Sequence, residues 1–250
     1  MNKGIFICIV YRRGILLHLK THPDFICLGV QKSATTWLYK QFCNHPRFHM
    51  PLNKELRFFS PFFCKNIKRY MSFFKSHENH LSGDMTPEYF TNEKAAIQIK
   101  NNFPRSKLFV ILRNPIDRAL SHYRMALNLG NLKPSIAFID CFLKDFNLIA
   151  SKGLYDDQLL KYMNHFELNK NLKVFFYDDL IKSPTEFFCS ICEYLNVEKY
   201  VPNSINECDV SKYKNDGIIY KKEDRLLVSE FYKKSIKRLS EILDKKISWI

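Results

Sequence analysis

Glycine is scarce in this sequence, at 7 of 250 residues. So low a content excludes collagen-like chains and glycine-rich linkers. The sequence also does not match the G-x-x-x-x-G-K-[ST] phosphate loop of nucleoside triphosphatases, because only Gly29 and Lys32 are present and their spacing is wrong. Hydrophobic residues make up 46% of the chain and charged residues 26%, which indicates a globular protein rather than a disordered one.

The cysteines form no disulfide or metal pattern. Eight are present, and all are single except Cys189 and Cys192, which share an apolar-periodic helix with no second pair to complete a zinc site. A chain of this length can also build a core without a disulfide framework. We therefore expect reduced thiols, no metal and a cytoplasmic protein.

Long apolar runs are missing as well. The N-terminal run that follows Lys3 is interrupted by Arg12 and Arg13 after about seven residues, whereas a membrane span needs about 20. No clear cleavage site with small residues follows. We expect no membrane span here, and a leading strand or helix that packs on the domain.

Acidic residues are fewer than basic ones, 25 against 39, which gives a net charge of +14. Such a surplus favours anionic partners without choosing among nucleotides, acidic glycans, nucleic acid and membrane surfaces. A nucleic-acid partner is less well supported, because no recognised nucleic-acid-binding motif is present and the aromatic residues lie within apolar elements rather than on a basic face.

Short β-rich runs alternate with helical patterns, which predicts an α/β fold with a mainly parallel sheet. The run "KLFVILR" at 107–113 is apolar without alternation, as expected of a strand covered on both faces. The other predicted strands are 25–30, 172–180 and, more weakly, 80–86.

The sequence also indicates where helices begin. One helix is expected from Thr35 to Asn44, and a second after Asn114, which can cap it with Pro115 in the first turn. Apolar residues at helical spacing predict further helices at 154–166, 184–195 and 224–246. No repeat or linker appears, so we expect a single domain.

The loop "VQKSATT", at 30–36, joins a predicted strand to a predicted helix. Lys32 supplies a positive charge, and residues 33–36 supply N–H and O–H donors at a helix N-terminus. Such a turn is suited to an anion, most often a phosphate. An ordinary strand–turn–helix with a surface lysine is the alternative.

A second anion site is expected where the strand 107–113 ends. Arg113 falls at the carboxyl end of that strand, where open α/β sheets bind ligands, and Ser121 lies two turns into the following helix. An arginine fork and a hydroxyl suit a phosphate. Two such sites on neighbouring strand ends imply a nucleotide phosphorylated at two separated positions.

These segments resemble the phosphate motifs of a known family. "QKSATTWLY" and "LRNPIDRALSHY" are similar to the paired 5′- and 3′-phosphate motifs of sulfotransferases that use 3′-phosphoadenosine 5′-phosphosulfate (PAPS). "KELRFF", "GDMTPEYF" and "GLYDDQLLKYMNHF" resemble the branch of heparan-sulfate-type and bacterial carbohydrate sulfotransferases. The matches run in order from about residue 24 to 249, after an N-terminal extension of residues 1–23.

The resemblance implies a three-layer fold like that of P-loop nucleoside triphosphatases, and transfer of a sulfuryl group to an acceptor hydroxyl or amine. Lys32 matches the lysine that supports the 5′-phosphate and the leaving oxygen. The remaining residues implied to hold the nucleotide are Ser33, Ala34, Thr35, Thr36, Trp37, Arg113, Ser121 and Tyr177. Trp37 would stack on adenine, unless it is a core indole, and Tyr177 would lie near the base. The basic loop "SKYKNDG", at 211–217, would close over the 3′ side.

The general base has two candidates. Glu55 matches the base of the heparan-type branch, unless it is a solvated glutamate paired with Lys54 or Arg57. His122 competes because the small-phenol branch uses a histidine, although from a different motif. We expect Glu55 to be the base and His122 to be a packing residue beside Ser121.

Two positions depart from the family pattern. Ala34 replaces the usual glycine, which is tolerable if it keeps a negative φ. Met85 replaces a lysine near the acceptor, so an acidic acceptor is less well supported. A glycan is the expected acceptor from the branch resemblance, with a lipid, polyketide or small-metabolite alcohol as alternatives. A P-loop kinase and a nucleotide-binding protein without catalytic activity are further alternatives.

Overall fold

The main sheet has four parallel strands. The computed structural model describes residues 8–12, 15–60, 66–74, 76–77, 79–206 and 222–250. Within these ranges the strands lie in the order β5 (Gly83–Met85), β3 (Phe25–Cys27), β6 (Lys107–Leu112) and β7 (Leu172–Phe176). Cys27 is in register with both Met85 and Phe109, and Leu112 is opposite Phe176. All four strands therefore point their carboxyl ends at one edge.

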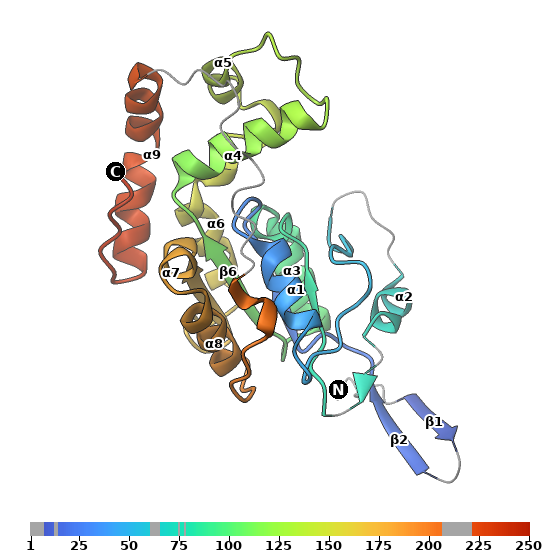
Figure 1. Cartoon of the computed structure of the whole chain (residues 1–250). Helices are drawn as coiled ribbons and strands as arrows, with labels where there is room; N and C mark the ends of the chain where they lie inside the picture. The colour runs from blue at the N-terminus through green and yellow to red at the C-terminus, as the bar shows by residue number, and fades with distance from the viewer. Residues whose placement is uncertain (1–7, 13–14, 61–65, 75, 78, 207–221) are drawn as a thin grey trace.

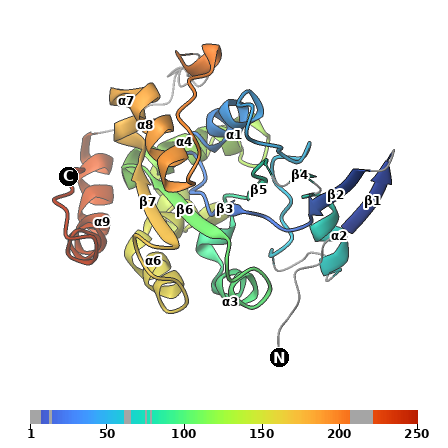
Figure 2. The same cartoon turned by 90° about the horizontal axis from the view of Figure 1, so that it is seen from below.

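Helices cover both faces of this sheet, as Figure 2 shows. On one face, Leu108, Val110 and Leu112 of β6 pack in one apolar cluster with residues of α3 (Glu93–Asn102) and α6 (Tyr155–Met163). On the other, Phe109 and Ile111 pack with residues of α1 (Thr35–Cys43) and α8 (Pro184–Tyr194). The predicted parallel sheet, buried on both faces, is confirmed as a three-layer α/β fold.

A third cluster packs beside the sheet. It joins α4 (Pro115–Asn128), α5 (Phe138–Leu143) and α9 (Lys222–Ile242), and α4 and α5 lie at the same end of the molecule in Figure 1. The shorter elements are α2 (Ile67–Ser72), α7 (Tyr177–Lys182), and the 3₁₀ turns η1 (Tyr89–Thr91), η2 (Phe146–Leu148), η3 (Ser151–Gly153) and η4 (Asn203–Asn206). Among the described residues, no helix combines the length and apolarity that a membrane crossing requires.

The N-terminal segment forms an antiparallel hairpin. Its strands are β1 (Cys8–Arg12) and β2 (Ile15–Lys20), and β2 pairs with β4 (Ser76–His77) to make a separate sheet of three strands. The hairpin extends outward at the edge of the molecule in Figures 1 and 2. The expectation for this segment was a leading strand or helix that packs on the domain. It forms two strands, which pair with each other and with β4 rather than with the main sheet.

The start of α4 is formed as predicted. The Asn114 side chain accepts a hydrogen bond from the backbone N–H of Ile116 at 2.9 Å, and Pro115 occupies the first turn. The same Asn114 amide donates to the carbonyl of Trp249 at 2.9 Å, so the cap also ties the C-terminal segment to the edge of the sheet where the strands end.

The predicted strand at 172–180 is too long. The chain leaves β7 at Phe176 and enters α7 at Tyr177, with Asp178 and Asp179 in the first turn of that helix. Carboxylates there interact favourably with the helix dipole, whereas aspartate is disfavoured in strands, so the helix begins at this point. The single-domain organisation and the cytoplasmic location stay predictions.

We expect the Phe42→Ala substitution to lower the free energy of unfolding by about 3–5 kcal/mol, because it empties a fully buried site. The Phe42 ring lies 4.4 Å from Phe48 and 5.1 Å from Phe25, measured between ring centres. Leu52, which is 99% exposed, offers the control: Leu52→Ala should change stability by less than about 0.5 kcal/mol. Urea unfolding of both variants measures the difference, and equal losses would contradict this packing.

Candidate functional site

The N-terminus of α1 is open to an anion. Its N-cap residue, Ala34, forms no side-chain cap, and the first turn carries no acidic residue. Side chains of Asn92, Asn114 and Ser183 cap α3, α4 and α8, whereas α5, α6 and α7 have no side-chain cap but carry acidic residues in the first turn. The first N–H groups of a helix have no partner inside the helix, and the dipole makes that end positive. The start of α1 therefore offers donors with neither a side-chain cap nor a first-turn carboxylate beside them.

The loop turns through two left-handed residues. Lys32 has a φ of 75° and Ala34 a φ of 58°. The condition of a negative φ, under which an alanine at position 34 would be tolerable, is therefore not met. A side chain in this conformation costs about 1–2 kcal/mol relative to the right-handed region. The chain tolerates that cost at the turn that leads from the loop into α1.

Arg113 joins this loop to the neighbouring strand. It follows β6 directly, and its Nη1 donates to the backbone carbonyl of Lys32 at 2.9 Å. Its guanidinium carbon also lies 4.4 Å from the centre of the Tyr177 ring, which begins α7. The ends of β3, β6 and β7 thus bring together Lys32, Arg113 and Tyr177, which the sequence places far apart.

Buried donors at this edge lack protein partners. The Ser33 hydroxyl, the Trp37 indole N–H and the Arg113 Nε are all buried, and none of them has a hydrogen-bond partner within the part of the chain that the structure describes. Leaving a buried polar group unpaired costs about 1–3 kcal/mol. A ligand with several acceptor oxygens would relieve that cost, so this donor set fits a phosphorylated nucleotide.

Lys32 lies among other cations. Burial lowers its pKa most, and the charges of Arg113 and Lys54 lower it further, to about 8. Such a lysine still carries its charge at neutral pH. An anion placed against Lys32 and Arg113 would raise this pKa again, because it would offset the repulsion between the two cations.

The other predicted nucleotide residues lie on α1 and α4. Thr35 is buried and Thr36 is exposed at the start of α1. The Trp37 ring is 6% exposed and lies 6.2 Å from the ring of Phe187, so most of its indole is core. Ser121 is 9% exposed on α4. The loop at 211–217 lies outside the described residues.

His122 is buried beside Ser121. Its Nδ1 lies 3.5 Å from Nη1 of the fully buried Arg118, one turn earlier in α4. Burial lowers the pKa of His122 most, and the charges of Arg118, Lys152 and Lys32 lower it further, to about 3. This imidazole is therefore neutral at physiological pH, and it resists protonation.

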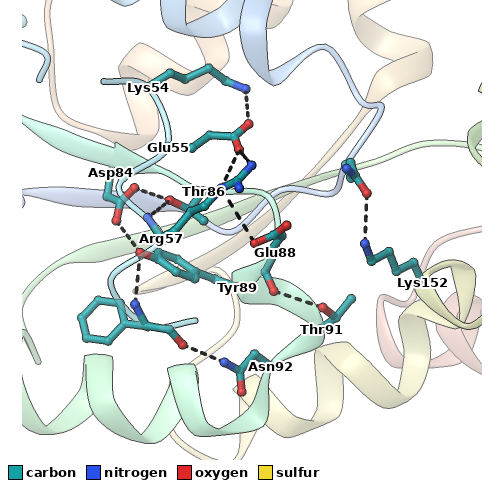
Figure 3. Close-up of polar contacts among 12 residues, drawn as sticks. Lys54, Glu55, Arg57, Asp84, Thr86, Glu88, Tyr89, Thr91, Asn92 and Lys152 are labelled. Carbon is teal, nitrogen blue, oxygen red and sulfur yellow. Dashed lines mark hydrogen bonds and ion pairs between the residues drawn. The ribbon is translucent and has the colours of Figure 1, made fainter. Parts of the chain in front are cut away.

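Glu55 lies between two cations, as Figure 3 shows. Lys54 Nζ is 3.0 Å from Oε1, and Arg57 Nη2 is 2.9 Å from Oε2. Burial raises the pKa of Glu55, but the hydrogen bonds and charges of Arg57 and Lys54 outweigh burial and leave the pKa below its ordinary value. The carboxylate, which is 28% exposed, is ionised at neutral pH.

Asp84 anchors the segment that carries Glu55. This fully buried carboxylate accepts hydrogen bonds from the hydroxyls of Tyr70 at 2.9 Å, Tyr89 at 2.8 Å and Thr86 at 2.7 Å. Thr86 Oγ1 in turn accepts from the backbone N–H of Arg57 at 3.1 Å (Figure 3). Asp84 therefore connects α2, β5 and the 54–59 segment in one network.

Met85 does not face the site. Its side chain is 0% exposed and belongs to the cluster between the sheet and α1. Sequence reasoning missed the roles of Asp84, Arg118 and Lys152, because each also contacts another segment: Tyr70, the Ile149 carbonyl and Gln31, respectively. Among the described residues, no group of three or more histidine, cysteine or acidic side chains could hold a metal ion.

Comparisons with known proteins agree on one family. The family model described as "Sulfotransferase domain" matches residues 22–246. A relative in Caenorhabditis briggsae, "Bifunctional heparan sulfate N-deacetylase/N-sulfotransferase 1", is 28% identical over 202 residues, which cover 72% of this chain and 23% of that protein. The chain spans about a quarter to a half of the length of the first curated relatives it matches.

Solved structures share the fold. A sulfotransferase from Alicyclobacillus acidocaldarius aligns with a TM-score of 0.79 at 20% identity, covering 91% of this chain and 98% of that one. Mouse sulfotransferase SULT7A1, complexed with PAP, aligns with a TM-score of 0.62 at 16% identity, covering 92% and 95%. At these identities the likeness establishes the architecture.

We predict that Asp84 makes stability fall as pH rises. Burial raises the pKa of Asp84 to about 6, despite the hydrogen bonds it accepts. Between pH 4 and 6 the folded state then binds the proton more tightly than the unfolded state, so the contribution of Asp84 to the free energy of unfolding is greatest near pH 4. From pH 4 to 7, the stability of the unsubstituted protein relative to Asp84→Asn should fall by about 2–3 kcal/mol.

Urea unfolding at each pH measures this difference. The exposed Asp157 provides the control, because Asp157→Asn should show no comparable trend. If stability relative to Asp84→Asn instead rises with pH, the hydrogen bonds lower this pKa, and the prediction is wrong.

Proposed function

The chain belongs to the sulfotransferase family, and from that premise we propose that it transfers a sulfuryl group from PAPS to an acceptor hydroxyl or amine, with a carbohydrate as the acceptor. One observation carries the proposal: the hydrogen bond from Arg113 to the Lys32 carbonyl joins two anion-binding segments at one edge of the sheet. The buried unpaired donors around it suit a ligand with phosphates at two positions.

In this proposal the loop and α1 hold the 5′-phosphate. Lys32 supplies charge, and Ser33, Ala34, Thr35 and Thr36 supply backbone and hydroxyl donors. Arg113 and Ser121 hold the 3′-phosphate, as the order of the motifs implies. The Tyr177 ring lies against the Arg113 guanidinium and keeps it in place. Trp37 presents the edge of its indole to the adenine ring of the nucleotide.

Lys32 has the main electrostatic role. PAPS supplies an activated sulfuryl group, whose S–O bond to the 5′-phosphate breaks while the acceptor atom bonds to sulfur. Negative charge grows on the leaving phosphate oxygen, and a lysine already positioned there stabilises it without reorganisation. Because burial and Arg113 lower the pKa of Lys32 to about 8, its ammonium gains more from this added charge than an exposed lysine would.

Glu55 is better suited than His122 to accept the proton that the acceptor loses. Its carboxylate is ionised and partly exposed, and Lys54 and Arg57 fix its direction. Burial lowers the pKa of His122 most, and the charges of Arg118, Lys152 and Lys32 lower it further, to about 3, so a proton on His122 is disfavoured. We therefore assign the base to Glu55 and a packing role to His122.

A glycan acceptor is supported by the heparan sulfate named for the nematode relative. The acceptor side also carries exposed positive charge: the Arg57 side chain is 54% exposed beside Glu55. Arg57 and Lys54 compensate for the lysine that the family has where this chain has the buried Met85. These cations suit the carboxylate or sulfate groups of an acidic polysaccharide.

The proposal predicts transfer of label from ³⁵S-labelled PAPS to a polysaccharide. N-desulfated heparan sulfate and unsulfated heparosan are the first acceptors to test, with 4-nitrophenol and a glycolipid mixture as the non-glycan comparison. Lys32→Ala should reduce transfer by about 100-fold or more, since it removes charge stabilisation at the leaving oxygen. Transfer to the phenol or lipid alone would contradict the glycan assignment, and near-normal transfer by Lys32→Ala would remove Lys32 from the chemistry.

The base assignment predicts that Glu55→Gln lowers kcat by about 10²–10⁴-fold and leaves nucleotide affinity unchanged. Because the pKa of Glu55 is lowered, kcat/KM of the unsubstituted protein should stay level down to about pH 5. Glu167→Gln, at an exposed glutamate paired with Lys170, is the matched control. If Glu55→Gln stays active while His122→Gln is inactive and still folded, the base is His122.

A further inference from the structure

The segment that carries Lys152 is held unusually firmly. Side chains from three helices donate to successive carbonyls: Arg118 to Ile149, Tyr232 to Ala150 at 2.8 Å, and Gln158 to Ser151 at 3.0 Å. The Asp145 carboxylate accepts from the N–H groups of Ala150 and Ser151, at 2.8 and 3.0 Å. Each of these hydrogen bonds joins the backbone of the segment to a side chain. The segment therefore has a fixed position although it belongs to no sheet or long helix.

Gly153 fixes the same segment from its other end. A Cβ atom placed on Gly153 would lie 2.6 Å from the Tyr232 hydroxyl oxygen and 2.7 Å from the ring, so the backbone touches the tyrosine directly. Arg118 and Tyr232 are both fully buried. Buried polar groups thus hold one short turn in position, and Lys152 is the middle residue of that turn.

Lys152 points from this turn to the nucleotide loop. Its ammonium donates to Oε1 of Gln31 at 3.0 Å, across 121 residues of sequence (Figure 3). Gln31 directly precedes Lys32. Burial lowers the pKa of Lys152 most, and the charges of Glu88, Arg118, Asp145 and Arg57 also act on it. Lys152 therefore contacts the loop that carries Lys32 and lies within electrostatic range of Arg57, in the segment that carries Glu55.

The simpler explanation of this contact is that Lys152 only holds the loop in place. Such a role requires a hydrogen-bond donor but no positive charge. The neutral amide oxygen of Gln31 compensates a half-buried ammonium only weakly, so this explanation does not account for the charge. Other cations of the site already contact protein oxygens: Lys54 and Arg57 pair with Glu55, and Arg113 binds the Lys32 carbonyl. Lys152 is a further ammonium beside the loop, and its hydrogen bond there is to the neutral amide of Gln31.

We propose that Lys152 binds the sulfuryl group itself, so that its ammonium contacts a sulfuryl oxygen between the nucleotide loop and the proposed base. This rests on the proposed function. Lys152 is then a donor-specificity residue: it distinguishes PAPS from the desulfated product PAP (3′-phosphoadenosine 5′-phosphate), because only PAPS carries the group it contacts.

Binding without acceptor tests this directly. Isothermal titration gives the Kd of PAP and of PAPS for the unsubstituted protein, Lys152→Met and Lys152→Arg. We expect Lys152→Met to weaken PAPS binding about tenfold or more, as for loss of a hydrogen bond to a charged group, and to change PAP binding less than about twofold. Lys152→Arg keeps the charge and should recover part of the lost affinity.

Two further variants separate a charge contact from a role that only holds the loop in place. Gln31→Ala removes the amide partner and leaves Lys152 in place, so PAPS should still bind more tightly to it than to Lys152→Met. Lys170→Met removes an exposed lysine, 70% accessible, and should change neither affinity.

Three results would overturn the inference. Equal loss of PAP and PAPS affinity in Lys152→Met would mean that Lys152 only supports the loop. Unchanged affinity for both would mean that it does not reach the donor. If the unsubstituted protein binds neither nucleotide, the proposed function fails, and this inference fails with it; binding of both by the unsubstituted protein keeps the two questions separate.

Discussion

The hydrogen bond from Arg113 to the carbonyl of Lys32 is the contact on which the site depends. It joins the first residue after β6 to the loop that follows β3, and the parallel register of the two strands makes it possible. Because Arg113 also lies over the ring of Tyr177, its guanidinium is held from the β7 side as well. One side chain thus fixes the relative position of three strand ends.

This arrangement concentrates positive charge in a partly buried place. Burial lowers the pKa of Lys32 most, and the charges of Arg113 and Lys54 lower it further. A fold accepts such a cost when an anionic ligand offsets it, and buried donors without partners at the same edge support that explanation. The acceptor side differs, since Glu55 is paired with its cations and the buried Asp84 network holds its segment.

The sequence predicted what is local. The apolar strand 107–112, the Asn114 cap and the start of α1 each follow from neighbouring residues, and all three are present. The end of β7 was not predictable from apolarity alone, because "VFFYDDL" reads equally well as strand or helix until Asp178 and Asp179 are placed in a first turn. The left-handed Ala34 was missed because sequence pattern does not report φ at a non-glycine residue. The contacts of Lys152 with Gln31 and of Asp84 with Tyr70 were missed because they join different segments that share no spacing.

The central claim is that one nucleotide bridges the loop at 30–36 and Arg113, with phosphates at two separated positions. Thermal unfolding with PAP and with ADP tests it most directly, because both ligands carry two phosphates and differ in where these are attached. At 100 times its Kd, PAP should stabilise the protein by about 2.7 kcal/mol, with a clearly smaller effect of ADP at the same concentration. Equal stabilisation by the two nucleotides, or none by PAP, would contradict the account.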